Sequence, residues 1–152
     1  MRCVIADDHP LFRNALSTLL ADSGLASGIE TVGDVAALHA HMETAGAPEL
    51  LLLDLHMPGA SGFSALGWLT GSYPQTPVVM ISANTHPDTV RRAIDLGAAA
   101  FLSKSTSTRS IDDCLRRVLA GERGLHPELA IGSDGTALKT LDTAEAVGTL
   151  TP

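Results

Sequence analysis

The residues of this sequence best suited to chemistry are three aspartates, a serine and a lysine, each at or just after the end of a short apolar run: Asp7, Asp8, Asp54, Ser82 and Lys104. Three carboxylates held close together repel one another, and one would take up a proton unless a cation neutralised them. Mg²⁺ prefers such oxygen ligands and keeps open positions for phosphate oxygens. An ammonium and a hydroxyl suit the oxygens of an incoming phosphoryl group. These residue types predict Mg²⁺-dependent phosphoryl transfer.

Asp54 stands at the centre of this hypothesis because it ends the apolar run 50–54 and precedes the turn His56-Met57-Pro58-Gly59. Its carboxylate could act as a nucleophile and form an aspartyl phosphate, while Mg²⁺ and a lysine absorb the charge of the in-line transfer. Alone, Asp54 could equally cap the following helix. The other site residues have similarly plain explanations, as solvated loop acids, a strand-end cap and a surface lysine. Their joint placement at strand ends favours the functional interpretation.

Five short apolar runs are predicted to be strands of one parallel sheet: 2–6, 29–32, 50–54, 78–81 and 99–102. The central run is apolar up to its last residue, Asp54, which is typical of a strand buried on both faces. The carboxyl ends of parallel strands gather at one edge, where open α/β sheets place their ligand sites. The five polar residues should therefore meet there.

A helical pattern follows each predicted strand. Apolar residues recur at intervals of three and four over 11–20, 35–45, 63–69, 90–97 and 111–119. Pro10 suits the first turn of the first helix, and Asp34 and Ser61 are suited to cap the second and third. Strands that alternate with helices in this way predict a doubly wound, flavodoxin-like (βα)5 α/β fold with a five-stranded parallel sheet.

Composition excludes several classes of protein. The formal net charge of −7 gives no basic surface for nucleic acid, and no apolar run approaches the ~20 residues of a membrane span. The N-terminus lacks the long apolar stretch of a signal peptide. Cys3 and Cys114 lie far apart in apolar segments, as expected of reduced, buried thiols, so we predict a cytoplasmic protein without membrane contact.

Four segments together carry a resemblance to a known family: VIADDHPLFR, LLLDLHMPG, VVMISA and AAAFLSKS. In this order and spacing they resemble the receiver domain of bacterial two-component response regulators over residues 2 to about 121. The wording DDHPLFR is most similar to the NarL/FixJ, or LuxR-type, subfamily. The resemblance implies a phosphoprotein that signals in a phosphorelay, catalysing only its own phosphorylation and slow dephosphorylation.

The resemblance also implies a role for each site residue. Asp54 would accept a phosphoryl group from the phosphohistidine of a sensor histidine kinase. Asp8 would bind Mg²⁺ (or Mn²⁺) directly with Asp54 and the backbone carbonyl of His56, and Asp7 would support the ion partly through water. Lys104 would contact the phosphoryl oxygens.

The same resemblance implies a conformational switch. Ser82 would contact the phosphoryl group and move inward, Phe101 would follow, and His56 and Asn84 would tune the lifetime of the phosphate. The sequence departs from the common pattern in having Ser105 after the lysine, where many receivers have proline, and in having Phe101 in place of tyrosine. These departures concern the shape of the switch, since every group needed for the chemistry is present.

Beyond the domain assigned to residues 1–121, residues 122–152 are rich in Gly, Ser, Thr and Asp and are predicted to be a flexible linker. The closing Leu150-Thr151-Pro152 resembles the start of a LuxR-type helix-turn-helix domain, or it is a chance match. We expect DNA binding to belong to such an output domain, absent from these 152 residues, which controls transcription. Dimerisation on phosphorylation is expected. The arginines of the last two helices are a candidate contact or simply a solvated surface: Arg91, Arg92, Arg109, Arg116 and Arg117.

Two other functions fit parts of this pattern. An aspartate-nucleophile phosphohydrolase also starts from a strand-end aspartate, but it typically has a second acid two residues further on, where this chain has His56. A pseudo-receiver would be an interaction module that needs no phosphate, and retention of the five site residues argues against it. The receiver is therefore the favoured prediction.

Overall fold

The computed structural model describes residues 1–59 and 61–126, and strands and helices alternate strictly along this part of the chain. The strands are β1 (Arg2–Ala6), β2 (Gly28–Val32), β3 (Leu50–Asp54), β4 (Val78–Ser82) and β5 (Ala100–Ser103). The helices are α1 (Pro10–Asp22), α2 (Val35–Ala45), α3 (Gly62–Ser72), α4 (Pro87–Asp95) and α5 (Thr108–Leu119). The predicted (βα)5 fold is confirmed.

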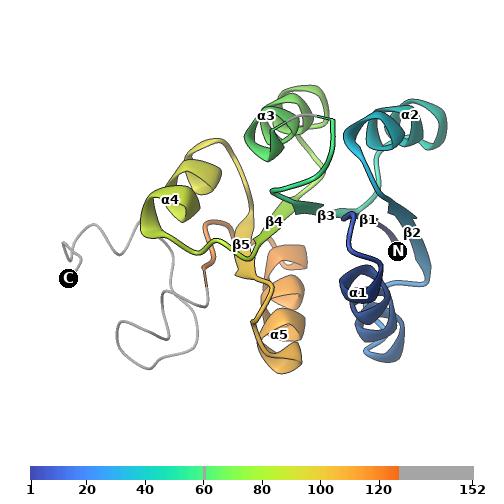
Figure 1. The fold of residues 1–152 in the computed structure, drawn as a ribbon. Helices are drawn as coiled ribbons and strands as arrows, with labels where there is room; N and C mark the ends of the chain where they lie inside the picture. Colours follow the sequence, from blue (N-terminus) through green and yellow to red (C-terminus); the bar gives the residue numbers. More distant parts are fainter. Residues whose placement is uncertain (60, 127–152) are drawn as a thin grey trace.

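All strand pairs are parallel, and the order across the sheet is β2-β1-β3-β4-β5. The chain first winds one way from β1 to β2 and then the other way from β3 to β5. Helices α2, α3 and α4 consequently cover one face of the sheet, and α1 and α5 cover the other (Figure 1). The order reverses between β1 and β3, the place where doubly wound sheets bind ligands.

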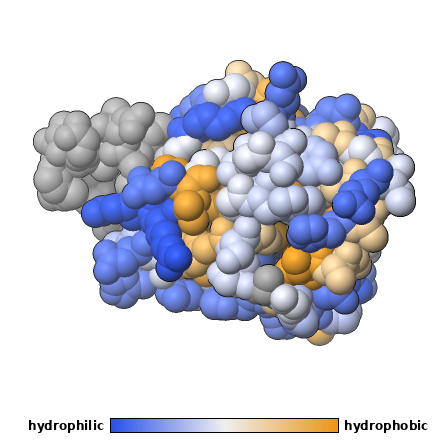
Figure 2. Space-filling view, turned by 90° about the horizontal axis from the view of Figure 1, so that it is seen from above, coloured by the Kyte–Doolittle hydropathy of each residue, from blue (hydrophilic) through white to orange (hydrophobic). Residues whose placement is uncertain are grey.

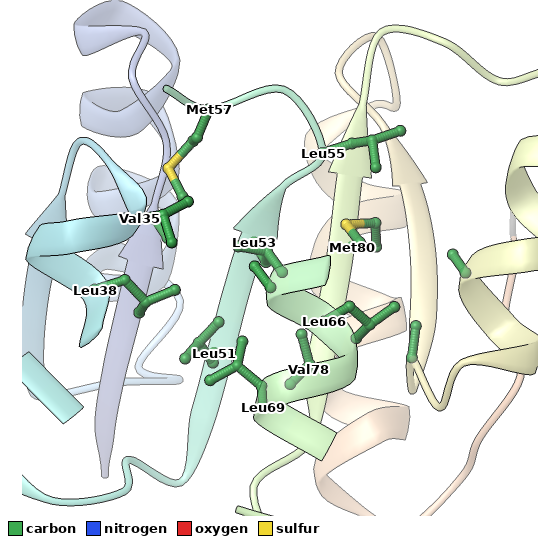
Figure 3. Close-up of a cluster of buried hydrophobic side chains, with 14 of the residues drawn as sticks. Val35, Leu38, Leu51, Leu53, Leu55, Met57, Leu66, Leu69, Val78 and Met80 are labelled. Carbon is green, nitrogen blue, oxygen red and sulfur yellow. The ribbon is translucent and has the colours of Figure 1, made fainter. Parts of the chain in front are cut away.

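Successive side chains of the strands alternate between two hydrophobic clusters, one on each face of the sheet. On β3, Leu51 and Leu53 pack against α2 and α3 on one face, and Leu50 and Leu52 pack against α1 and α5 on the other. All four leucines are fully buried, which explains why β3 is apolar up to its last residue, Asp54. Figure 3 shows Leu51 and Leu53 among the side chains of the first cluster. The buried site aspartate at the end of β3 thus stands on a rigid strand.

The predicted caps of two helices are confirmed. The Asp34 side chain accepts a hydrogen bond of 2.7 Å from the Ala37 amide, and the Ser61 hydroxyl accepts one of 3.1 Å from the Phe63 amide. Each bond satisfies an amide that the first turn of a helix leaves without a backbone partner. Cys3 and Cys114 are buried free thiols, as predicted, and burial raises the pKa of each to about 12.

The packed body continues past the predicted boundary at residue 121. Leu125 is fully buried, its amide donates to Ala99 and its carbonyl accepts from the Phe101 amide at 2.8 Å. It forms a parallel bridge with Ala100 on the open edge of β5. The structure thus extends the domain's contacts through His126, which is also buried. The rest of the predicted 122–152 linker, residues 127–152, lies outside the described residues.

The distribution of hydrophobic residues on the surface and the length of the helices can be compared with the predictions from composition. Seen from above in the view of Figure 1, over the helices on that face of the sheet, hydrophobic residues form small patches separated by hydrophilic ones (Figure 2). Among the residues that the structure describes, no helix is long and apolar enough to cross a membrane.

Candidate functional site

The carboxyl ends of β1, β3 and β5 bring the predicted charged residues together. Asp7 directly follows β1, Asp54 ends the adjacent β3, and Lys104 directly follows β5. Ser82 ends β4, between β3 and β5. Strands of similar length in parallel register place all these residues at one edge of the sheet. The prediction that they converge is borne out for the charged groups by the distances that follow.

Three carboxylates form the centre of the site. Asp7 and Asp54 are each only 1% exposed, while the Asp8 side chain is 32% exposed. Backbone amides orient the two buried groups: the His9 amide donates to Asp7 Oδ1 at 2.7 Å, and the His56 amide donates to Asp54 Oδ1 at 3.1 Å. The second oxygen, Oδ2, of each buried carboxylate lies close to the ammonium of Lys104.

Lys104 supplies the positive charge that this arrangement needs. Its Nζ lies 3.1 Å from Asp7 Oδ2 and 3.2 Å from Asp54 Oδ2, so one ammonium bridges the two buried carboxylates. It also lies 5.1 Å from the centre of the Phe12 ring, within range of a cation–π contact. The lysine is thereby held beside the Asp54 carboxylate.

Burial raises the pKa of the Asp54 carboxyl above its ordinary value, since the ion loses its water. The hydrogen bond from the His56 amide opposes that effect, the nearby Asp7 charge reinforces it, and Lys104 opposes it. The upward shift is the net result of these influences. A second positive charge at the site would favour the ionised, nucleophilic form of Asp54.

The donor set fits a hard divalent cation. Oxygens of the three carboxylates lie within 4.8 Å of one another, close enough to share one ion. Asp7 Oδ2 and Asp8 Oδ1 are buried atoms without a hydrogen bond, although each lies near a basic group. Burial of a carboxylate oxygen without a hydrogen bond costs free energy, and coordination of a metal ion compensates for that cost.

His9 is the site residue that sequence reasoning missed. Its Nδ1 lies 2.8 Å from Lys104 Nζ, 3.2 Å from Asp7 Oδ1 and 3.1 Å from Asp8 Oδ1. From the sequence, His9 is predicted only to stand at the start of a helix. It is indeed the N-cap residue of α1, but its side chain makes no capping hydrogen bond because the ring turns toward the carboxylates. The signal was its position directly after the acidic pair.

The predicted switch residues are buried in different surroundings. Ser82 is fully buried, and its hydroxyl accepts a hydrogen bond of 2.9 Å from the Asn84 amide. Phe101 is 2% exposed and belongs to the hydrophobic cluster on the face of the sheet covered by α2, α3 and α4, with Val90 and Ala93 of α4. A displacement of Phe101 would therefore change the packing of α4.

Two openings flank the site. One, of about 320 Å³, is bounded by His9, Leu11, Phe12, Asp54, His56, Ala83 and Lys104. The other, of about 550 Å³, lies between the loops after β3 and β4 and is bounded by Asp8, Leu55, His56, Met57, Pro58, Ser61, Gly62, Phe63, Asn84 and Thr89. His56 borders both openings and Asn84 borders the wider one, so both predicted tuning residues are accessible from these openings.

Several surface arginines contact groups of their own chain. Arg92 lies 4.3 Å above the Phe63 ring, Arg116 pairs with Asp112 at 3.1 Å, and Arg117 pairs with Glu122 at 2.6 Å. These contacts are of the kind found on a solvated helix surface. They do not depend on a second copy of the chain.

A flavodoxin-like (βα)5 fold with an acidic cluster and a lysine at the carboxyl edge of the sheet defines a receiver-type signalling domain. The chain belongs to the response regulator receiver domain family, whose model matches residues 3–116. This membership decides against the phosphohydrolase, because the family is one of signalling proteins. The predicted family is confirmed.

Individual relatives agree. The glycerol metabolism activator of Pseudomonas putida is 34% identical over 128 residues, which are 84% of this chain and 58% of that protein. The response regulator protein VraR of Staphylococcus aureus is 30% identical, over 86% of this chain and 62% of its own length. The chain thus spans about three fifths of the curated relatives that it matches.

Solved structures give the same result. The signal receiver domain of the putative response regulator NarL from Mycobacterium tuberculosis is 34% identical, with a TM-score of 0.71 over 80% of this chain and 97% of that domain. The resemblance to NarL-type receivers is therefore confirmed. The isolated receiver domain of RcsB from Salmonella enterica serovar Typhimurium has a TM-score of 0.77 at 21% identity, which shows the shared fold.

Proposed function

We propose that Asp54 accepts a phosphoryl group from a sensor histidine kinase and that the resulting aspartyl phosphate switches the conformation of this domain. The observation that carries the proposal is the ammonium of Lys104, which bridges the buried carboxylates of Asp7 and Asp54 at 3.1 and 3.2 Å. A lysine fixed in this way stands beside the atom that would bear the phosphoryl group. The family membership supports the same role.

In the proposed step, a carboxylate oxygen of Asp54 attacks phosphorus, and the bond between phosphorus and the donor nitrogen breaks. The donor imidazole leaves with the electron pair of that bond, and an acyl phosphate remains. Lys104 can shift from its two carboxylate partners to the phosphoryl oxygens, whose negative charge it balances. Asp7, Asp8, Asp54 and the backbone carbonyl of His56 would hold Mg²⁺ or Mn²⁺, which supplies further charge neutralisation.

Ser82 and Phe101 form the proposed switch. The Ser82 hydroxyl would exchange the Asn84 amide for a phosphoryl oxygen, and Phe101 would repack against α4. His56 and Asn84, which border the openings beside the acceptor, would set the lifetime of the phosphate. The altered surface around α4 and β5 would favour a homodimer.

The domain's output is proposed to be transcription control in the cytoplasm, exerted through a DNA-binding domain outside these 152 residues and reached through residues 122–152. The relatives support this proposal, because their names include an activator of metabolism and response regulators, and they are longer than this chain. Autophosphorylation and slow dephosphorylation would be the domain's only catalytic activities.

Intact-protein mass spectrometry tests the function. The protein is incubated with a small phosphodonor such as acetyl phosphate and Mg²⁺, beside Asp54→Asn and beside the same mixture with excess chelator. Gain of one phosphoryl group in the wild-type protein alone, and only with Mg²⁺, supports the proposal. Equal phosphorylation of Asp54→Asn would refute the assignment of the acceptor, and no gain in any sample, even with a kinase, would refute the function.

A further inference from the structure

The imidazole of His9 faces into the carboxylate cluster, although neither the fold nor the chemistry proposed above requires a nitrogen there. Its Nδ1 lies within 3.7 Å of an oxygen of each of Asp7, Asp8 and Asp54. A ring nitrogen surrounded by three carboxylates is unusual for a hard-cation site, whose ligands are normally oxygens. The position of this nitrogen therefore needs an explanation other than the binding of a hard cation.

Lys104 also contacts this nitrogen. An ammonium has three protons and no lone pair, so in a hydrogen bond between Lys104 Nζ and His9 Nδ1, which lie 2.8 Å apart, Nδ1 accepts. The same Nδ1 is the ring atom that faces the carboxylates, and it lies 3.2 Å from Asp7 Oδ1. An unprotonated imidazole nitrogen is also the form that ligates metals.

A second observation points to a ligand in the same place. Asp7 is 1% exposed, and its Oδ2 has no hydrogen bond, although it lies in ion-pair range of Lys104. The ammonium thus stands among the lone pairs of one nitrogen and of two buried carboxylates. A metal cation entering the cluster would meet both kinds of donor.

We propose that His9 Nδ1 is a metal ligand of this site, which gives the domain a preference for borderline transition-metal cations such as Mn²⁺, Ni²⁺ and Zn²⁺ over Mg²⁺. Imidazole suits such metals, whereas Mg²⁺ is bound by oxygens. For a mixed nitrogen and oxygen site the affinity rises from Mn²⁺ to Ni²⁺. The inference rests on the proposed function, because it concerns the same cation site.

Two properties of the chain make the proposal testable by metal binding itself. Cys3 and Cys114, the only thiols in the sequence, are fully buried and do not compete for Zn²⁺ or Ni²⁺. His86, in the loop after β4, provides a control: its side chain is exposed, its Nδ1 lies 3.9 Å from a carboxylate oxygen of Asp88, and it is not one of the residues of the cluster. Loss of His86 removes a surface imidazole and leaves the four residues of the cluster in place.

The experiment measures dissociation constants for Mg²⁺, Mn²⁺, Ni²⁺ and Zn²⁺ by titration calorimetry on the wild-type protein, His9→Gln and His86→Ala. Glutamine retains an oxygen that can accept from Lys104 but lacks the imidazole. In His9→Gln we expect Ni²⁺ and Zn²⁺ to bind about 10- to 100-fold more weakly, a range that loss of an outer partner of a metal ligand already produces. Mg²⁺ binding should change far less, and His86→Ala should resemble the wild-type protein. In ¹⁵N spectra, Ni²⁺ or Zn²⁺ should perturb the His9 Nδ1 signal first.

Three outcomes would overturn the proposal. Unchanged Ni²⁺ and Zn²⁺ affinity in His9→Gln would exclude nitrogen ligation. An equal loss for Mg²⁺ and Ni²⁺ would mean that His9 only positions Lys104. Absence of divalent binding to the wild-type protein would remove the site altogether. Phosphorylation of Asp54 is measured separately, so a wild-type protein that is phosphorylated with Mg²⁺ but fails the His9→Gln test refutes this inference and leaves the function standing.

Discussion

Gly62, the first residue of α3, is predicted to be a position where even alanine destabilises the protein. A methyl group there would lie 2.6 Å from Cα and 2.7 Å from the carbonyl carbon of Leu55, and closer still to its carbonyl oxygen. The clashing atoms are backbone, and the Gly62 amide donates to the same carbonyl at 3.1 Å. The loop after β3 must therefore move as a unit to admit the methyl group.

The magnitude follows from the competing effects. Relief of the clash requires a shift of about 1 Å, and such overpacking costs about 1–3 kcal/mol. Alanine regains at most about 1 kcal/mol of helix propensity, and less at a first helical position. We expect Gly62→Ala to lower the free energy of unfolding by about 1–2 kcal/mol. Because Leu55 directly follows Asp54, phosphorylation by a small phosphodonor should also slow.

Gly67, in the middle of the same helix, is the matched control. A methyl group there meets no atom within 4 Å, so Gly67→Ala should stabilise the protein by about 0.5–1 kcal/mol. Urea unfolding followed by the fluorescence of Trp68, the single tryptophan, measures both variants. A Gly62→Ala protein as stable as the wild type, or destabilisation by Gly67→Ala of the same size, would refute the steric argument.

Three further predictions concern the site and the domain boundary. Because burial raises the pKa of Asp54 in the folded protein, its ionisation destabilises the fold above the unfolded pKa of about 3.8. Asp54→Asn should therefore be more stable than the wild type at pH 7, and urea unfolding at falling pH should show this gain vanish as the pH approaches that value; a constant gain would contradict the argument. Lys104→Met leaves two buried carboxylates without their ammonium, a change worth about 3–5 kcal/mol for a buried pair. Mg²⁺ should then raise the melting temperature of the variant more than that of the wild type, and an equal rise would contradict the bridging role. Leu125→Ala should cost about 2–5 kcal/mol in urea unfolding if the packed domain extends past residue 121, and a negligible cost would return the boundary to Gly121.

The fold could be predicted because its periodicities were unambiguous. The run from Leu50 to Leu53 is apolar at every position, as is typical of a strand covered on both faces, and amphipathic helices follow each strand at short intervals. Parallel strands then fix which ends meet, so Asp54 and Lys104 could be placed at one edge without coordinates. The segment around Leu125 escaped prediction because a single backbone bridge has no repeating pattern to reveal it.

His9 escaped for a different physical reason. Its neighbours in sequence predict the start of a helix, where the side chain of the N-cap residue usually accepts a hydrogen bond from the first turn. The His9 ring makes no such bond and lies against the carboxylates instead. The orientation of the ring depends on Lys104, which follows β5 near the end of the domain and donates a hydrogen bond to His9 Nδ1. The residues next to His9 in the sequence include Asp7 and Asp8, but Lys104, which contacts its ring, is distant in sequence. Because its ring contacts a partner 95 positions away, the role of His9 can be recognised only from the folded sheet edge. At that edge a cation would meet both nitrogen and oxygen donors, and its preference between them depends on the metal.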